Sequence, residues 1–193
     1  MLTFARIPQF YKDVLAMVQQ VAPEAIIGGG ALRDLHYGRQ VKDIDIFVGP
    51  DNWADDAPSV PGCTLNPVVP LGCNLEEYKE FWGGRLIGVY DLFVNSPDVP
   101  PFSFTTSTVA HLPVQVIVLK NFPDFPDVLE DFDLFFSQIG FNGDRLHATN
   151  GFWDDEYNGT ITVRPGADAA SLQRTEKRLD RMALKYPEKR IVR

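Results

Sequence analysis

The chain has 193 residues, of which 45% are hydrophobic, so it is long and apolar enough to bury a core rather than remain disordered. It contains no apolar run near 18 residues and no basic start followed by an apolar stretch, so neither a membrane-spanning helix nor a secretory signal is predicted. The formal net charge of −8 argues against broad, non-specific binding of nucleic acid, which depends on many Lys and Arg contacts to phosphate.

The N-terminal quarter predicts a helix, a strand, a short helix and a second strand. Residues 8–22 carry apolar side chains at helical spacing, which predicts an amphipathic packing helix. An apolar strand-like stretch at 25–27 runs into three glycines. A short helical segment, a turn at Gly38-Arg39 and a second strand ending at Val48 follow. Residues 49–72 hold five prolines in irregular order and predict a long loop.

The remaining elements alternate with a second long loop rich in Pro, Ser and Thr. We expect this loop at 95–113 and helices at 75–82, 126–131 and 169–186. Strands are expected at 85–94, 113–119 and 134–141, with one or two short strands within 145–163. The two cysteines, Cys63 and Cys73, have no His cluster nearby, so we expect free thiols in a reducing cytoplasm, with a disulfide as the alternative.

Two acidic side chains interrupt the second predicted strand. Asp43 and Asp45 alternate with Ile44 and Ile46, and residues two apart in a strand point to the same face. Two carboxylates inside an apolar strand are costly unless a cation or a partner uses them. Mg²⁺ prefers hard oxygen ligands, completed by waters and substrate phosphates. The pattern therefore predicts a site for Mg²⁺ (or Mn²⁺) on Asp43 and Asp45.

Three short motifs follow one another in this region. They are Gly29-Gly30-Ala31-Leu32-Arg33-Asp34, Gly38-Arg39 and Asp43-Ile44-Asp45. Together they resemble the catalytic core of the polymerase-β-like nucleotidyltransferase superfamily. The likeness is strongest to the head domain of the tRNA CCA-adding and poly(A) polymerase branch. It implies the minimal nucleotidyltransferase fold and transfer of an NMP from an NTP, with Asp43 and Asp45 as catalytic metal ligands.

The same resemblance implies a set of phosphate contacts, and a glycine turn before a helix offers backbone N–H groups to a phosphate in any case. The residues expected to contact phosphate are Gly29, Gly30, Arg33, Arg39 and Lys42. Arg33 offers a forked donor, and its alternative role is a salt bridge to Asp34 or another local acid. For Arg39 and Lys42, the alternative is plain surface charge.

The superfamily adds a third carboxylate from a neighbouring strand, and Gln115 is the best positional counterpart here. Glutamine is neutral and a weaker ligand, so Asp91 and Asp133 are the alternatives. Asp91 lies within a predicted strand. Asp133 lies in the segment 130–139, which resembles the R-D-F-T-I-N-A segment of CCA-adding enzymes. The residues alone do not choose between Asp91 and Asp133.

The predicted C-terminal helix has an apolar face and a neighbouring basic face. From Arg174 to Arg193 there are 8 Lys or Arg and 3 Asp or Glu. The apolar face should pack on the core. The basic face, which consists of Arg174, Arg178, Arg181 and Lys185, is either solvated or in contact with nucleic acid or triphosphate.

These observations predict one α/β domain over residues 1–193, with a mixed sheet, flanking helices, a core at 25–147 and a C-terminal helix at 169–186. The chain ends where CCA-adding enzymes would continue into helical tRNA-binding domains. It is therefore more similar to small stand-alone nucleotidyltransferase-like proteins of bacteriophages and bacteria. We expect a cytoplasmic enzyme with an NTP as substrate and an RNA end, a protein or a small molecule as acceptor.

Two alternatives to an active enzyme remain open. Gln115 motivates a catalytically impaired nucleotide- or RNA-binding module or regulator on the same fold. The acidic composition motivates a toxin-like or host-modifying factor that acts on a protein.

Overall fold

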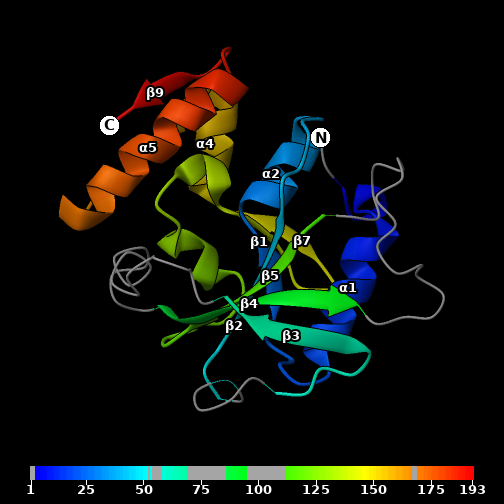
Figure 1. Ribbon diagram of the computed structural model, residues 1–193. Helices are drawn as coiled ribbons and strands as arrows, with labels where there is room; N and C mark the ends of the chain where they lie inside the picture. Colours follow the sequence, from blue (N-terminus) through cyan, green and yellow to red (C-terminus); the bar gives the residue numbers. More distant parts are fainter. Residues whose placement is uncertain (1–2, 52, 54–57, 69–85, 95–111, 167–168) are drawn as a thin grey trace.

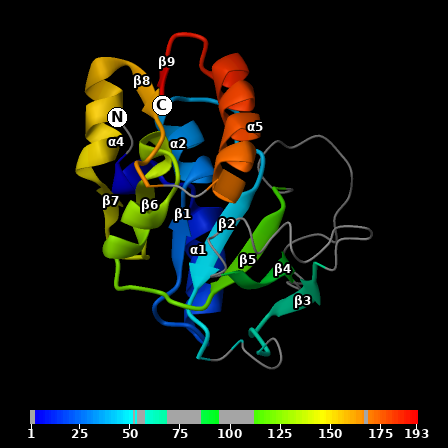
Figure 2. The same cartoon turned by 90° about the vertical axis from the view of Figure 1, so that its left-hand side faces the viewer.

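A computed structural model (Figure 1) describes residues 3–51, 53, 58–68, 86–94, 112–166 and 169–193. Strands form a mixed sheet in the order β3-β4-β5-β2-β1-β6-β7, and Figure 2 shows β2, β5, β4 and β3 following one another across it. The pair β2 and β5 is parallel, and the other neighbours are antiparallel. The strands are β1 Ile26–Gly28, β2 Ile44–Val48, β3 Cys63–Pro67, β4 Leu86–Val94, β5 Val114–Leu119, β6 Ile139–Phe141 and β7 Leu146–Ala148.

Helices flank this sheet, which confirms the expected α/β class. They are η1 Phe4–Arg6, α1 Gln9–Gln19, α2 Gly30–His36, η3 Asp127–Asp131, η4 Phe135–Ser137, α4 Asn150–Asn158 and α5 Ala169–Lys185. A separate parallel pair, β8 Thr160–Thr162 with β9 Arg190–Val192, lies beside α4 and α5 (Figure 2). Among the helices of the described ranges, none combines the length and the apolarity needed to cross a bilayer.

The largest core lies between α1, α2 and one face of the sheet. The buried face of α1 carries Tyr11, Val14, Leu15 and Val18, which recur at helical spacing. Strand β2 sends Ile44, Ile46 and Val48 to the same core because alternate residues of a strand share a face. Each fully buried aliphatic side chain stabilises the folded state by about 1.5–3 kcal/mol. Burial of these side chains therefore fixes the register of β2, and Asp45 lies on the opposite face of the sheet.

The opposite face of the sheet has its own apolar cover. Phe47 of β2 and Ile117 of β5 pack there against η3 and Phe132. Helix α5 packs elsewhere, in a third cluster where Leu179 and Tyr186 join Phe136. The C-terminal helix thus buries an apolar face as expected, but against η4 and β8 rather than against the main sheet.

Several expected elements need correction. Strand β3 lies inside the loop expected at 49–72 and pairs with β4. The strand expected at 134–141 is split into η4 and β6. The short strands expected within 145–163 are confirmed as β7 and β8, but the helix α4 between them was not expected; it is capped by the Thr149 hydroxyl and ends at Gly159 in the left-handed region. Strand β9 was not expected at all. The helix expected at 75–82 and the loop residues 95–111 lie outside the described residues.

The expected helices at 8–22 and 169–186 and the strands at 25–27, 85–94 and 113–119 are confirmed, with shifted ends. The strand expected to include Asp43 and to end at Val48 is also confirmed, but it begins at Ile44, so Asp43 directly precedes it. The short helix expected at 126–131 is a 3-10 helix. Cys63 carries a free thiol whose pKa is raised by burial, whereas Cys73 lies outside the described residues.

Candidate functional site

The candidate site begins at the glycine turn between β1 and α2. Gly29 has φ +73°, a conformation that suits glycine, and a Cβ on Gly28 would lie 2.9 Å from the ring of Phe132. Gly29 N–H donates to the carbonyl of Ile139 at 2.9 Å and is thereby used within the fold. The first N–H groups of a helix have no partner inside it, and in α2 these belong to Gly30 and Ala31.

Asp45 faces this turn from the neighbouring strand. The antiparallel register pairs Ile26 with Phe47 and Ile27 with Ile46, so the same register places Gly28 opposite Asp45. Cross-strand neighbours lie about 4.5–5.5 Å apart. The turn that follows Gly28 and the carboxylate of Asp45 are therefore parts of one site.

Asp43 directly precedes β2 at the same end of the sheet. The Ile44 N–H donates to the carbonyl of Pro113 at 2.8 Å, so the chain already runs along β5 here. Lys42 Nζ lies 3.1 Å from Asp43 Oδ2, and the Lys42 side chain is 81% exposed. Asp43 and Asp45 are both partly exposed.

A row of polar side chains continues from Asp45 across three further strands. Gln115 pairs in register with Asp45 on one side and with Asp91 on the other, and Asp91 pairs with Asn66. Residues paired in register point to the same face of a sheet. Gln115 Nε2 donates to Asp91 Oδ1 at 3.0 Å. The structure therefore brings Asp91 into line with Asp45, with Gln115 between them.

Asp133, the other alternative for the third carboxylate, is engaged elsewhere. It forms an ion pair with Arg178 and accepts a hydrogen bond from the Thr175 hydroxyl at 3.1 Å. Both partners lie on α5. The carboxylate of Asp133 thus ties the C-terminal helix to the segment between η3 and η4.

Arg33 is buried rather than displayed on the surface. Its guanidinium donates to Asp34 Oδ1 from Nε at 2.9 Å and from Nη2 at 2.7 Å, and to the Ser137 hydroxyl at 2.9 Å. Tyr186 and Lys185, at the end of α5, bind the same Asp34 carboxylate. The salt-bridge alternative for Arg33 is what the structure shows, and Ser137 and Tyr186 are partners that the sequence pattern did not reveal.

Arg39 lies at the surface and is also paired. Its Nη2 contacts both carboxylate oxygens of Glu188, at 3.0 and 3.1 Å, and both side chains are more than 40% exposed. Exposed pairs of this kind are worth about 0–1 kcal/mol, so little free energy holds Arg39 in this position.

The basic face of α5 is partly used inside the protein. Arg178 pairs with Asp133, and Lys185 pairs with Asp34 and donates to the Gln40 carbonyl at 2.7 Å. Arg181 is exposed, and the side chain of Arg174 lies outside the described part of the chain. Two of the four basic residues thus fasten α5 to the fold.

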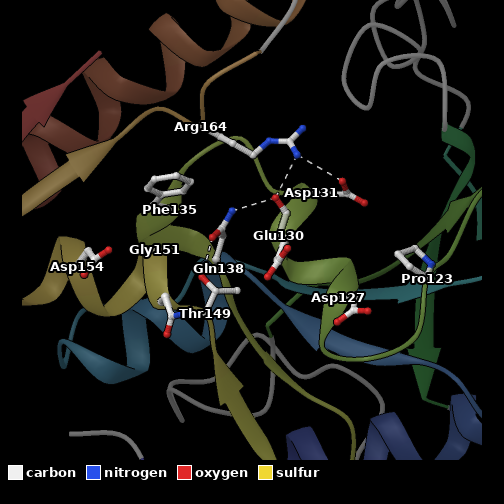
Figure 3. A pocket seen from close by; sticks show the side chains of 11 residues that line it. Pro123, Asp127, Glu130, Asp131, Phe135, Gln138, Thr149, Gly151, Asp154 and Arg164 are labelled. Atoms are coloured by element: carbon white, nitrogen blue, oxygen red, sulfur yellow. Dashed lines mark hydrogen bonds and ion pairs between the residues drawn. The ribbon is translucent and has the colours of Figure 1, made fainter.

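A separate hollow of about 580 Å³ lies between η3, η4 and the start of α4 (Figure 3). Among the described residues that line it, four are acidic, Asp127, Glu130, Asp131 and Asp154, and one is cationic, Arg164, which lies 3.4 Å from Asp131. This charge balance disfavours a triphosphate there. The segment 130–139, singled out for its resemblance to CCA-adding enzymes, thus forms the wall of an acidic hollow.

The donor set at Asp43 and Asp45 suits a hard divalent cation. Two carboxylates completed by waters and substrate phosphates are the usual protein share of a Mg²⁺ site. Over the described ranges, no three His, Cys, Asp or Glu side chains gather as a metal-binding group.

No family model and no curated protein matches this chain. Solved structures do match. One is a tRNA-processing enzyme in an apo form, with 17% identity and a TM-score of 0.56 over 97% of this chain and 45% of that chain. A second is the Bacillus stearothermophilus CCA-adding enzyme in complex with CTP, with 14% identity and a TM-score of 0.58 over 96% of this chain and 42% of that one.

A third is the Thermotoga maritima CCA-adding enzyme complexed with tRNA, with 17% identity and a TM-score of 0.52 over 97% of this chain and 40% of that one. At these identities the likeness shows a shared fold, which is the nucleotidyltransferase-like fold of CCA-adding enzymes. The chain spans less than half the length of these enzymes.

Proposed function

We propose that the protein transfers an NMP from an NTP to an acceptor hydroxyl in a reaction that depends on a divalent cation. One observation supports this proposal: the register that pairs Ile27 with Ile46 puts Gly28, just before the glycine turn, opposite Asp45. The fold supports it, because structurally similar enzymes were solved with CTP and with ATP.

In this proposal Asp43 and Asp45 would hold the cation, which would relieve charge on the leaving pyrophosphate and activate the attacking hydroxyl. The N–H groups of Gly30 and Ala31, which have no partner within the helix, bind phosphate oxygens at the start of α2. Gly29 contributes through its backbone conformation, because its own N–H is already used.

Cationic side chains complete the phosphate site. Lys42 is exposed and flexible enough to turn from Asp43 to a phosphate. Arg39 reaches phosphate by leaving Glu188, an exchange of one exposed anion for another. Arg33 is buried and supports the phosphate site indirectly, because its contacts with Asp34 and Ser137 fix the first turns of α2.

We propose an RNA end as the acceptor, because one similar enzyme was solved with tRNA. The acidic composition and the internal use of Arg178 and Lys185 speak against a wide basic surface. We therefore expect recognition of a short 3′ end, with few phosphate contacts and a weak dependence on salt.

A label-transfer assay tests the function and the acceptor together. Purified protein is incubated with each α-³²P NTP, with Mg²⁺ or Mn²⁺, and with total RNA or cell lysate, and the products are separated on RNA and protein gels. A labelled RNA band supports the proposal, and a labelled protein band would move the acceptor to a protein. No label from any of the four NTPs would contradict transferase activity.

Gln115 favours one second candidate, a nucleotide-binding module without turnover. A neutral side chain stands in register beside Asp45, where a further carboxylate would strengthen cation binding. This candidate predicts saturable NTP binding with no labelled product. If the protein is the proposed enzyme, we expect both saturable NTP binding and a labelled product.

A further inference from the structure

We propose that Asp91 is a positioning residue, which fixes the side-chain amide of Gln115 so that the Gln115 oxygen serves the cation held by Asp43 and Asp45. This inference rests on the proposed function, since it concerns the same cation site. It assigns a role to a carboxylate that stands two strands away from that site.

The register decides which side chain is nearest to Asp45. Gln115 is its direct neighbour on β5, whereas Asp91 is on β4, one strand further. Strands lie about 4.7–4.9 Å apart, so Asp91 is about 10 Å from Asp45 along the row. Because Mg²⁺ binds its oxygens at about 2.0–2.1 Å, Gln115 is the neighbour suited to share a cation with Asp45.

The hydrogen bond to Asp91 fixes which end of the amide faces the site. A carboxylate only accepts hydrogen bonds, so Gln115 must present its NH₂ group to Asp91, and it does so at 3.0 Å. The amide oxygen is then left for partners other than Asp91. Amide oxygens are accepted ligands of hard cations.

Asp45 competes with Asp91 for the same NH₂ group. Without Asp91, the amide is free to turn its NH₂ toward the Asp45 carboxylate. The site would then lose the Gln115 oxygen, and the NH₂ would occupy an Asp45 oxygen that the cation needs. Partners of this kind, one step removed from a metal, typically change metal affinity by about 10–100-fold.

Titrating the full-length protein with Mn²⁺, by calorimetry and electron paramagnetic resonance, tests this role without nucleotide or turnover. We expect Asp91→Ala and Gln115→Ala each to weaken Mn²⁺ binding about 10-fold, and the double variant to be no weaker than either one. Asp91→Asn keeps an acceptor oxygen for Gln115 and should stay within about threefold of the wild type.

A swapped pair gives the sharpest comparison. In Asp91→Asn/Gln115→Glu the hydrogen bond and the net charge are preserved, but the carboxylate moves one strand closer to Asp45. We expect this variant to bind Mn²⁺ about 10-fold more tightly than the wild type. Weaker binding by the swapped pair, or equal losses in Asp91→Asn and Asp91→Ala, would overturn the positioning role.

The Asp43→Ala/Asp45→Ala variant separates this inference from the proposed function. If it retains wild-type Mn²⁺ affinity, the cation site itself is wrong and both proposals fail. If it loses Mn²⁺ while the variants at 91 and 115 bind as the wild type does, only the positioning role fails. Urea denaturation of each variant checks that a loss of affinity does not follow from unfolding.

Discussion

The hydroxyl of Tyr186 accepts a hydrogen bond from Arg33 Nε at 3.2 Å, although 153 positions separate the two residues. The same hydroxyl donates to Asp34, and all three side chains are buried. The end of α5 is thereby bound to the helix that follows the glycine turn. Removing one partner from a buried charged network is costly, because the groups that remain lose their hydrogen bonds.

Tyr186→Phe should therefore lower the free energy of unfolding by about 1–3 kcal/mol, since it removes only the hydroxyl that Arg33 and Asp34 share. Urea denaturation at neutral pH measures the change. Tyr157→Phe is the matched control, because Tyr157 is 91% exposed and its change should stay within about 0.5 kcal/mol. Equal stability of the two variants would show that the network contributes nothing.

A second prediction concerns alkaline pH. Burial, with a contribution from the Asp34 carboxylate, raises the pKa of Tyr11 to about 12, whereas an unfolded tyrosine has a pKa of about 10. Above pH 10 the unfolded chain loses this proton and the folded chain keeps it, so stability falls as pH rises from 10 to 12. Burial raises the pKa of Tyr186 as well, with the same sign.

In Tyr11→Phe the slope of unfolding free energy against pH near pH 11 should become shallower by about one proton. Denaturant titrations at half-unit steps between pH 9 and pH 11.5 measure this slope. An unchanged slope would mean that Tyr11 is not protected by burial. Tyr157→Phe again serves as the exposed control.

The glycine turn offers a test of phosphate binding that leaves the fold intact. A Cβ on Gly30 would meet Arg33 Nη2 at 3.6 Å, an ordinary contact, and alanine is the better helix former. Gly30→Ala should therefore be at least as stable as the wild type. If phosphate binds as proposed, Gly30→Ala should bind NTP about tenfold more weakly, because the added methyl group would hinder close approach of a phosphate to the backbone.

Fluorescence titration with a labelled NTP measures this affinity, and thermal unfolding measures stability. Wild-type affinity in Gly30→Ala would place the phosphates away from the start of α2. Gly29→Ala is a less useful variant, since its positive φ makes loss of stability the first expected effect.

A fourth prediction tests the support of α4 and β8. Asp155 is buried and accepts hydrogen bonds from the Thr160 hydroxyl at 2.7 Å and from the Thr162 N–H and hydroxyl at 2.9 and 2.6 Å. Asp155→Ala leaves these donors without their acceptor and should cost about 3 kcal/mol of stability. The neighbouring Asp154 is exposed, and Asp154→Ala should change urea stability by no more than about 0.5 kcal/mol. A loss below about 1 kcal/mol in Asp155→Ala would contradict the structural role.

Periodicity predicted the parts of the fold whose pattern is local. Apolar residues alternate with polar ones in β2 and recur at helical spacing in α1, because each element buries one face. Such a pattern can be seen directly in the sequence. Helix α4 escaped prediction because its sequence, Asn150–Asn158, has few apolar residues and a glycine in its first turn. Its Thr149 cap and the left-handed Gly159 were the signals that marked its ends.

The candidate site was inferred from residues that are close together in the sequence. Asp43, Asp45 and the glycine turn lie within one short run, so their spacing pointed to shared chemistry. The link between Gln115 and Asp91 depends on the order of β4, β5 and β2, and the burial of Arg33 depends on α5. The spacing of residues along the sequence does not predict sheet order or long-range contacts of this kind.

The most direct test of the account is nucleotidyl transfer by Asp43→Ala/Asp45→Ala compared with the wild type at equal protein, NTP and Mg²⁺ concentrations. The matched control is Asp144→Ala, which removes an exposed carboxylate outside the site. A cation at this position supplies several kcal/mol of charge stabilisation, so the account predicts a loss of about 10³-fold in the double variant and none in the control. Full transfer activity in Asp43→Ala/Asp45→Ala would contradict it.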